Sequence, residues 1–183
     1  MVDRRDMKRY EDGLGGHIEI LEEGSEIAPV RFRMVMPPGF GPPAPESHPH
    51  QTEDFLVVRG TLDLGIIDGQ HVRLEAGDRY HLPAGIYHLP RNAGQGELEF
   101  EATLTPGKTT AEMFAQLYTE TRESKGLGQF LRQALVFSGH ANSITFRRPV
   151  LWMLRTAAVI ARILGIRLRG TERQASGKAE RTI

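Results

Sequence analysis

Histidine and carboxylate side chains gather in two short stretches of this chain. The stretch ESHPHQTED carries Glu46, His48, His50 and Glu53, and the stretch GIYHLP carries His88. Imidazole nitrogens and carboxylate oxygens are ligands for Fe, Mn, Ni, Cu and Zn. A metal held by a few such ligands keeps positions open for water, substrate or dioxygen, and it polarises an oxygen atom bound there. The pattern predicts a divalent metal site and leaves the identity of the metal open.

The spacing in the first stretch allows more than one ligand set. Residues i and i+2 of an extended segment point to the same side, so Glu46, His48 and His50 could all face one interior. Pro49 favours an extended backbone at His48. Glu53 begins the next predicted strand, where we expect it to act as a metal ligand or as a catalytic base. The predicted ligands are His48, His50, Glu53 and His88, with Glu46 as an alternative ligand.

A second pattern of fixed spacings surrounds His88. The string GDRYHLPAGIYHLPRN, which runs from Gly77 to Asn92, fits G-x5-P-x-G-x2-H-x3-N at every fixed position. A tight turn at Pro83-Ala84-Gly85 is expected to return His88 to the site. Asn92 is expected to fix a turn rather than to contact a substrate.

Together the two strings resemble the motifs of the cupin superfamily, which are small barrels built as a double-stranded β-helix. The family's first motif is H-x-H-x3,4-E-x6-G. Here His48, Glu53 and Gly60 have the family's spacing, and Glu46 then stands at the first histidine position. Alternatively, His48 and His50 form the H-x-H pair, with only two residues before Glu53. The resemblance is to single-domain, quercetin-dioxygenase-like cupins and covers roughly residues 17–105.

The residues between these motifs have the pattern of short strands. Eight runs rich in β-branched and aromatic residues occupy residues 17–105, and Gly, Pro and Asp-Gly separate them. Asp68-Gly69 is a hairpin signal. This pattern predicts a sandwich or a small barrel. The resemblance implies, more specifically, a mainly β fold, a double-stranded β-helix or jelly-roll barrel, followed by C-terminal α-helices. The expected parts are an N-terminal arm (1–16), the barrel (17–106), a helical extension (107–170) and a disordered tail (171–183).

Alternation along the strands predicts an apolar pocket at the metal end of the barrel. Its expected lining residues face the same side as Glu53 or His88, or lie on neighbouring strands: Phe55, Val57, Tyr80, Ile86 and Phe100. On the run VRFRMVM, the face of Phe32 and Met34 is expected to point inward, and that of Arg31 and Arg33 outward. The substrate would then be a small hydrophobic or aromatic molecule that bears oxygen.

The last third of the chain changes to a helical period, in TTAEMFAQLYTETRES, GLGQFLRQALVFSGH and VLWMLRTAAVIARILGIRLRG. Arg155, Arg162 and Arg169 lie seven apart and form a stripe on the last of these. An arginine costs about 2.5–3.5 kcal/mol at the centre of a bilayer, which argues against a spanning helix. Two interpretations stay open for the stripe: a solvated face of a helix packed on the barrel or in a dimer, and contact with an anionic membrane or an acidic partner.

Composition excludes several classes of protein. The 183 residues are 39% hydrophobic and 25% charged, which does not fit a wholly disordered, collagen-like or coiled-coil chain. The absence of cysteine excludes disulfides, thiolate metal sites and cysteine nucleophiles. The charged N-terminus lacks a signal-peptide pattern, so a cytoplasmic location is expected. The net charge of zero hides an asymmetry: residues 122–183 hold 12 basic and 3 acidic side chains, whereas residues 1–121 hold 11 and 20.

The resemblance implies a metal-dependent enzyme, an oxidoreductase of dioxygenase-like type. Two alternatives remain: an isomerase, lyase or cyclase that uses the metal as a Lewis acid, and a non-catalytic module that binds a ligand or docks on a membrane or partner. Family likeness also implies a homodimer. No nucleic-acid partner is expected, because the arginine stripe is short and accompanies no nucleic-acid-binding motif.

Overall fold

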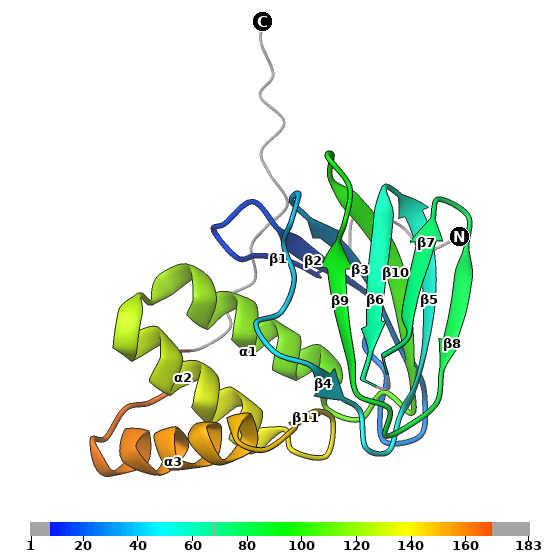
Figure 1. Ribbon diagram of the computed structural model, residues 1–183. Helices are drawn as coiled ribbons and strands as arrows, with labels where there is room; N and C mark the ends of the chain where they lie inside the picture. The colour runs from blue at the N-terminus through cyan, green and yellow to red at the C-terminus, as the bar shows by residue number, and fades with distance from the viewer. Residues whose placement is uncertain (1–7, 68, 170–183) are drawn as a thin grey trace, which may run out of the picture.

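A computed structural model describes residues 8–67 and 69–169. Two antiparallel sheets face each other, and a layer of helices lies beside them (Figure 1). The larger sheet has the strand order β1 (Lys8–Glu11), β2 (His17–Glu22), β3 (Val30–Met36), β10 (Leu98–Thr105), β5 (Thr52–Arg59) and β8 (Arg79–Leu82). The smaller sheet has the order β11 (Thr145–Phe146), β4 (Glu46–Ser47), β9 (His88–Asn92), β6 (Thr61–Ile66) and β7 (His71–Glu75). This arrangement confirms the predicted double-stranded β-helix followed by helices.

The barrel core follows from alternation along the strands. On β10, Leu98, Phe100, Ala102 and Leu104 are buried, and the residues between them are partly exposed. Strand β3 alternates in the same way, with Phe32 and Met34 inside. Its Arg33 lies outside and donates a hydrogen bond of 2.7 Å to Glu101. The prediction that the apolar face of this strand points inward is confirmed.

Three strands were not predicted from the sequence. Residues 8–11, assigned to an N-terminal arm, form β1 and pair with β2, and Tyr10 is buried in the barrel core. Strands β4 and β11 contain two residues each, which is too short for any periodicity to show. They pair with each other through Thr145 opposite Ser47 and Phe146 opposite Glu46.

The helical extension consists of α1 (Thr110–Glu123), α2 (Gly126–Gly139) and α3 (Val150–Ile163), with β11 between α2 and α3. Helix α1 lies next to the barrel and places Phe114 against Phe32, with ring centroids 4.9 Å apart. A second apolar core joins α2, α3 and β11 through buried residues that include Leu131, Phe146 and Leu154. In Figure 1, α1 lies between the barrel and α2, and α3 forms the outer edge of the helical layer.

The last helix is shorter than its sequence pattern predicted. It ends at Ile163, and Gly165 adopts a positive φ of +68°. The N–H of Ile166 then donates to the carbonyl of Ala161 (2.9 Å), which is the bond of a glycine-terminated helix end. Arg169 therefore leaves the predicted arginine stripe and contacts Glu120 of α1 instead. Among the described residues, no helix has the length and apolar character needed to cross a membrane. The predicted tail (171–183) lies outside the described residues.

Candidate metal centre

Strands from both sheets bring four candidate ligands together. Glu46 of β4 lies opposite His88 of β9, and His48 follows β4 directly. The ligand atoms of Glu46, His48 and His88 all lie within 4.8 Å of one another. Glu53, on β5 of the other sheet, places its Oε2 atom 3.5 Å from Nε2 of His48 and 3.1 Å from Nε2 of His88. Two imidazoles and two carboxylates thus converge at one end of the barrel.

The glycines and the asparagine of the two motifs hold the backbone that carries these ligands. Gly85 has a φ of +80°, and its N–H donates to the carbonyl of His48 (2.9 Å), so the turn of one motif is bound to the other. Gly60 has a φ of +87°, and a Cβ atom there would lie 2.7 Å from the carbonyl oxygen of Glu97. The side chain of buried Asn92 donates to the carbonyls of Met36 and Gly96, both at 2.9 Å. The predicted turn-fixing role of Asn92 is confirmed.

Backbone carbonyls orient both imidazoles. Nδ1 of His48 lies 2.6 Å from the carbonyl oxygen of Ser143, and Nδ1 of His88 lies 3.2 Å from that of Ile86. A carbonyl oxygen only accepts hydrogen bonds, so Nδ1 carries a proton in both rings and Nε2 is free to act as the ligand atom. This is the usual outer-shell arrangement of histidines that bind metals.

The Glu53 carboxylate provides a test of whether a metal fits. Its Oε2 atom is buried and has no hydrogen-bond partner among the described residues. It faces Nε2 of His48 and of His88, whose Nδ1 atoms already carry protons. A buried carboxylate oxygen beside two nitrogen lone pairs requires a cation or an extra proton between them. A divalent metal satisfies all three atoms, so the residues present fit such an ion.

Burial and mutual attraction shift the pKa values of these groups in different directions. Burial raises the pKa of Glu46. For Glu53, the two imidazoles outweigh burial and hold the carboxyl pKa below its usual value. For His88, burial acts to lower the pKa, but the adjacent Glu53 carboxylate outweighs it and raises the pKa to about 9. Without metal, His88 therefore carries a second proton, on Nε2, at neutral pH. A metal must displace this proton to bind.

The structure distinguishes the two ligand sets left open by the sequence. A turn begins at Pro49, and His50 lies in it with its side chain exposed. The alternation that would have placed His50 beside His48 ends at this turn. Among the described residues, the group of potential ligand atoms within 4.8 Å consists of Glu46, His48 and His88, without His50. The alternative ligand Glu46 therefore stands at the first histidine position of the motif.

The predicted pocket residues form the barrel wall near this centre. The rings of Phe55 and His88 form a T-shaped pair with centroids 6.1 Å apart, and the centroids of Phe55 and Phe100 lie 5.9 Å apart. Val57 is buried in the same core. Tyr80 and Ile86 are half-buried and pack against its margin. The ring of Phe55 therefore gives the candidate metal centre an apolar side.

The sequence did not reveal that the helical extension contributes to the site. Ser143, in the loop between α2 and β11, supplies the carbonyl that orients His48. The neighbouring His140 anchors this loop: its carbonyl accepts from the N–H of Ser143 (2.8 Å), and its Nδ1 lies 2.8 Å from Oγ1 of Thr109. Every residue type has a backbone carbonyl, so no sequence motif could have identified this contact.

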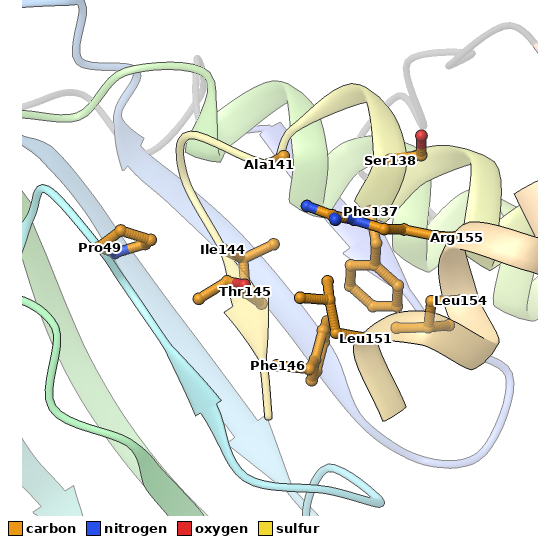
Figure 2. Close-up of a pocket in the computed structure, with 10 residues that line it drawn as sticks. All are labelled: Pro49, Phe137, Ser138, Ala141, Ile144, Thr145, Phe146, Leu151, Leu154 and Arg155. Carbon is orange, nitrogen blue, oxygen red and sulfur yellow. The ribbon is translucent and has the colours of Figure 1, made fainter. Parts of the chain in front are cut away.

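A cavity of about 240 Å³ lies between the helical extension and the segment that carries His48 (Figure 2). Pro49, Ile144 and Thr145 line it, and the first two are the chain neighbours of His48 and Ser143. Apolar side chains of the extension complete most of the wall, and Arg155 reaches across it in Figure 2. None of the five residues predicted to line a pocket borders this cavity.

Fold and motif spacing together define a double-stranded β-helix barrel with a candidate metal centre at one end. Residues 32–105 match the family model described as the cupin domain. Within the barrel, the chain therefore contains a region that matches the cupin domain.

Comparison with known proteins adds distant relatives. The chain is 29% identical over 106 residues to a protein named endoribonuclease YbeY from Myxococcus xanthus, a match that covers 58% of this chain and 33% of that protein. It is 32% identical over 84 residues to germin-like protein 5-1 of Oryza sativa subsp. japonica, covering 44% of this chain and 38% of that protein. The chain thus spans well under half the length of these curated relatives. A solved cupin described as a sugar phosphate isomerase, from Silicibacter pomeroyi, aligns with a TM-score of 0.48 at 19% identity, over 57% of this chain and 74% of that one.

Proposed function

We propose that Glu46, His48, Glu53 and His88 hold one divalent transition metal, and that the protein is a metal-dependent enzyme of dioxygenase-like type. The observation that carries this proposal is the buried Oε2 atom of Glu53, which lies 3.1 and 3.5 Å from two imidazole nitrogens and needs either a metal ion or an added proton between itself and these nitrogens. Two imidazoles and two carboxylates suit Fe, Mn, Ni, Cu or Zn.

The chain's own residues prepare this site in two ways. The carbonyls of Ser143 and Ile86 fix the two histidine rings, so that little reorganisation accompanies metal binding. The Phe55 ring beside His88 excludes water from one side. When bound, the metal would polarise an oxygen atom of a small substrate. The apolar surroundings favour a hydrophobic or aromatic molecule that bears such an oxygen.

The decisive experiment measures metal content by mass spectrometry in protein purified without chelator. The wild type is expected to hold about one transition metal ion per chain, and the His48→Ala/His88→Ala double variant none. The matched control is His71→Ala/His81→Ala, because both of these histidines are exposed on the barrel surface. A folded wild type that binds none of Fe, Mn, Ni, Cu or Zn after reconstitution would contradict the proposal.

Oxygen dependence then separates the proposed reaction from its alternative. Metal-dependent oxygen uptake with a small phenolic or enolic substrate, lost in the double variant, supports the dioxygenase-like reaction. Turnover of such a substrate under anaerobic conditions would instead identify an isomerase, lyase or cyclase that uses the same ligands.

A further inference from the structure

Helix α3 has two apolar faces, and only one of them is covered. Buried Leu154, Ala157, Ala158 and Ala161 form the inner face and belong to the core of the helical extension. The outer face consists of large apolar side chains that remain exposed: Trp152, Met153, Val159, Ile160 and Ile163. These residues recur at the spacing of one helical face, and Trp152 and Ile163 are 57% and 79% exposed. We call this set the α3 outer face.

Basic side chains flank the α3 outer face, and no acidic side chain accompanies them. Residues 124–169 contain eight Lys and Arg side chains and no Asp or Glu. Arg148 lies over the ring of Trp152, 5.0 Å from its centroid. Arg155 and Arg162 lie seven residues apart on α3, and Arg162 donates to Ser138. Within the described ranges, no ion pair involves any of these three arginines. Their charge is therefore available to an external anion.

We propose that the α3 outer face docks the protein peripherally on an anionic lipid surface. An amphipathic helix with an apolar face, an aromatic residue and flanking arginines lies in the plane of the membrane interface and inserts only its apolar side. Each basic side chain close to an anionic leaflet adds attraction, which salt weakens. Trp152 is suited to the headgroup level, where the amphipathic indole ring concentrates.

Charge and area both disfavour a second copy of this chain as the occupant. A two-fold contact through α3 would bring Arg155 and Arg162 towards their own copies, with no carboxylate on the helix to pair with them. The 14-residue helix is about 21 Å long. One face of such a helix covers a few hundred Å², whereas stable interfaces bury roughly 800 Å² per partner. An anionic bilayer has neither of these restrictions.

Trp152 makes the test direct, because it is the only tryptophan in the chain. Full-length protein is mixed with vesicles of phosphatidylcholine alone, or with about a third phosphatidylglycerol added. Sedimentation with the vesicles reports binding, and tryptophan emission reports the surroundings of the helix. We expect binding and a blue shift with the anionic vesicles only, quenching of Trp152 by brominated lipid, and release at high salt.

Two sets of variants assign the binding to this face. Arg155→Glu/Arg162→Glu is expected to weaken binding roughly tenfold or more, and Ile160→Ser/Ile163→Ser to reduce both binding and the blue shift. The matched controls are Arg79→Glu/Arg91→Glu and Ile27→Ser, which change exposed side chains of the barrel and should bind as the wild type does. Circular dichroism confirms that each variant is folded.

Three outcomes would overturn the proposal. The first is a folded wild type that does not bind anionic vesicles at low salt. The second is binding that the α3 variants and the barrel controls lower equally. The third is a wild-type dimer that Ile160→Ser/Ile163→Ser converts to a monomer, since the α3 outer face would then be an interface between two copies of this chain.

Discussion

The barrel and the helical extension contribute to the candidate metal centre in different ways. The barrel supplies all four candidate ligand side chains, from β4, β5, β9 and the residue after β4. The extension supplies the backbone carbonyl of Ser143, which orients His48. The ligand positions therefore require particular residue types at fixed spacing. The contact from Ser143 requires only that its loop lies next to His48. A site can thus be complete in its ligands and still require a second part of the chain to hold them.

The two regions meet at a small joint. Strands β4 and β11 pair over two residues, and Ser143 lies just before β11. Phe146 of β11 lies opposite Glu46 in this pair, so the joint is adjacent to a candidate ligand. Substitution of the candidate ligands in the barrel should therefore abolish metal binding, whereas substitutions at the joint should only weaken it.

The largest expected effect is a loss of metal affinity when the carboxylate of Glu53 is removed. Glu53→Gln replaces the oxygen that faces both imidazoles by a neutral amide. We expect metal affinity to fall more than the roughly 10- to 100-fold typical of outer-shell changes. The matched control is Asp54→Asn, because Asp54 is adjacent in sequence but exposed and paired with His81 at 2.7 Å. Metal titration of both variants checks this, and equal affinities would exclude Glu53 as a ligand.

The next effect tests the joint. Phe146→Ala removes a buried ring that packs on Phe137 at 4.9 Å. We expect a loss of about 3–5 kcal/mol in the free energy of unfolding, together with roughly 10-fold weaker metal binding because the Ser143 carbonyl is less firmly placed. The control is Phe130→Ala, a partly buried ring on α2 away from the joint. Denaturant unfolding and metal titration measure the two quantities. If both variants bind metal as the wild type does, the extension does not support the site.

The pH dependence of metal-free protein gives an intermediate effect. The pKa of His88 is raised to about 9 in the folded state, against 6.5 for its ordinary value. A raised pKa stabilises the fold fully below the unfolded value, and this contribution is lost as the pH rises from about 6.5 through 9. We expect chelator-treated protein to lose roughly 2 to 3 kcal/mol over this range. Thermal unfolding from pH 6 to pH 10 measures it, and metal-free His88→Gln should not show this loss. A wild type whose stability rises over this range would contradict the assignment.

Residue pattern predicted the barrel because its signals are local and redundant. Eight strands alternate visibly, and the spacing from Gly77 to Asn92 requires a particular turn, in which Gly85 donates to His48. The same reasoning placed Glu53 and His88 in one site, and the structure brings them there from opposite sheets. It named His50 as a ligand and Glu46 only as the alternative, because both have the parity of His48. The turn at Pro49 instead separates His50 from the other candidate ligands.

What could not be predicted depends on contacts between distant residues. Ser143 reaches His48 across 95 positions, through a backbone atom that every residue type possesses. The predicted stripe of Arg155, Arg162 and Arg169 assumed one continuous helix. Gly165 ends that helix, and Arg169 then contacts Glu120, 49 positions earlier in the chain. Tertiary contacts of this kind leave no periodic signal in the sequence.

The smallest expected effect compares arginines of the two regions. Arg33, on the barrel surface, lies 2.7 Å from Glu101, 3.5 Å from Glu99 and 3.8 Å from Glu19, and its side chain is 26% exposed. Because this network is partly exposed, Arg33→Met should cost at most about 1 kcal/mol in the free energy of unfolding, and the cost should shrink in high salt.

Arg155 provides the matched control in the extension. It has no ion pair within the described part of the chain, so Arg155→Met should leave the free energy of unfolding unchanged. Denaturant unfolding of both variants at low and high salt measures the difference. A cost for Arg33→Met and none for Arg155→Met would mean that arginines of the barrel neutralise its own carboxylates. The arginines of α3 would then be available to a partner. If Arg155→Met destabilises the protein as much as Arg33→Met does, the arginines of the extension serve its own fold, and the contrast between the two regions fails.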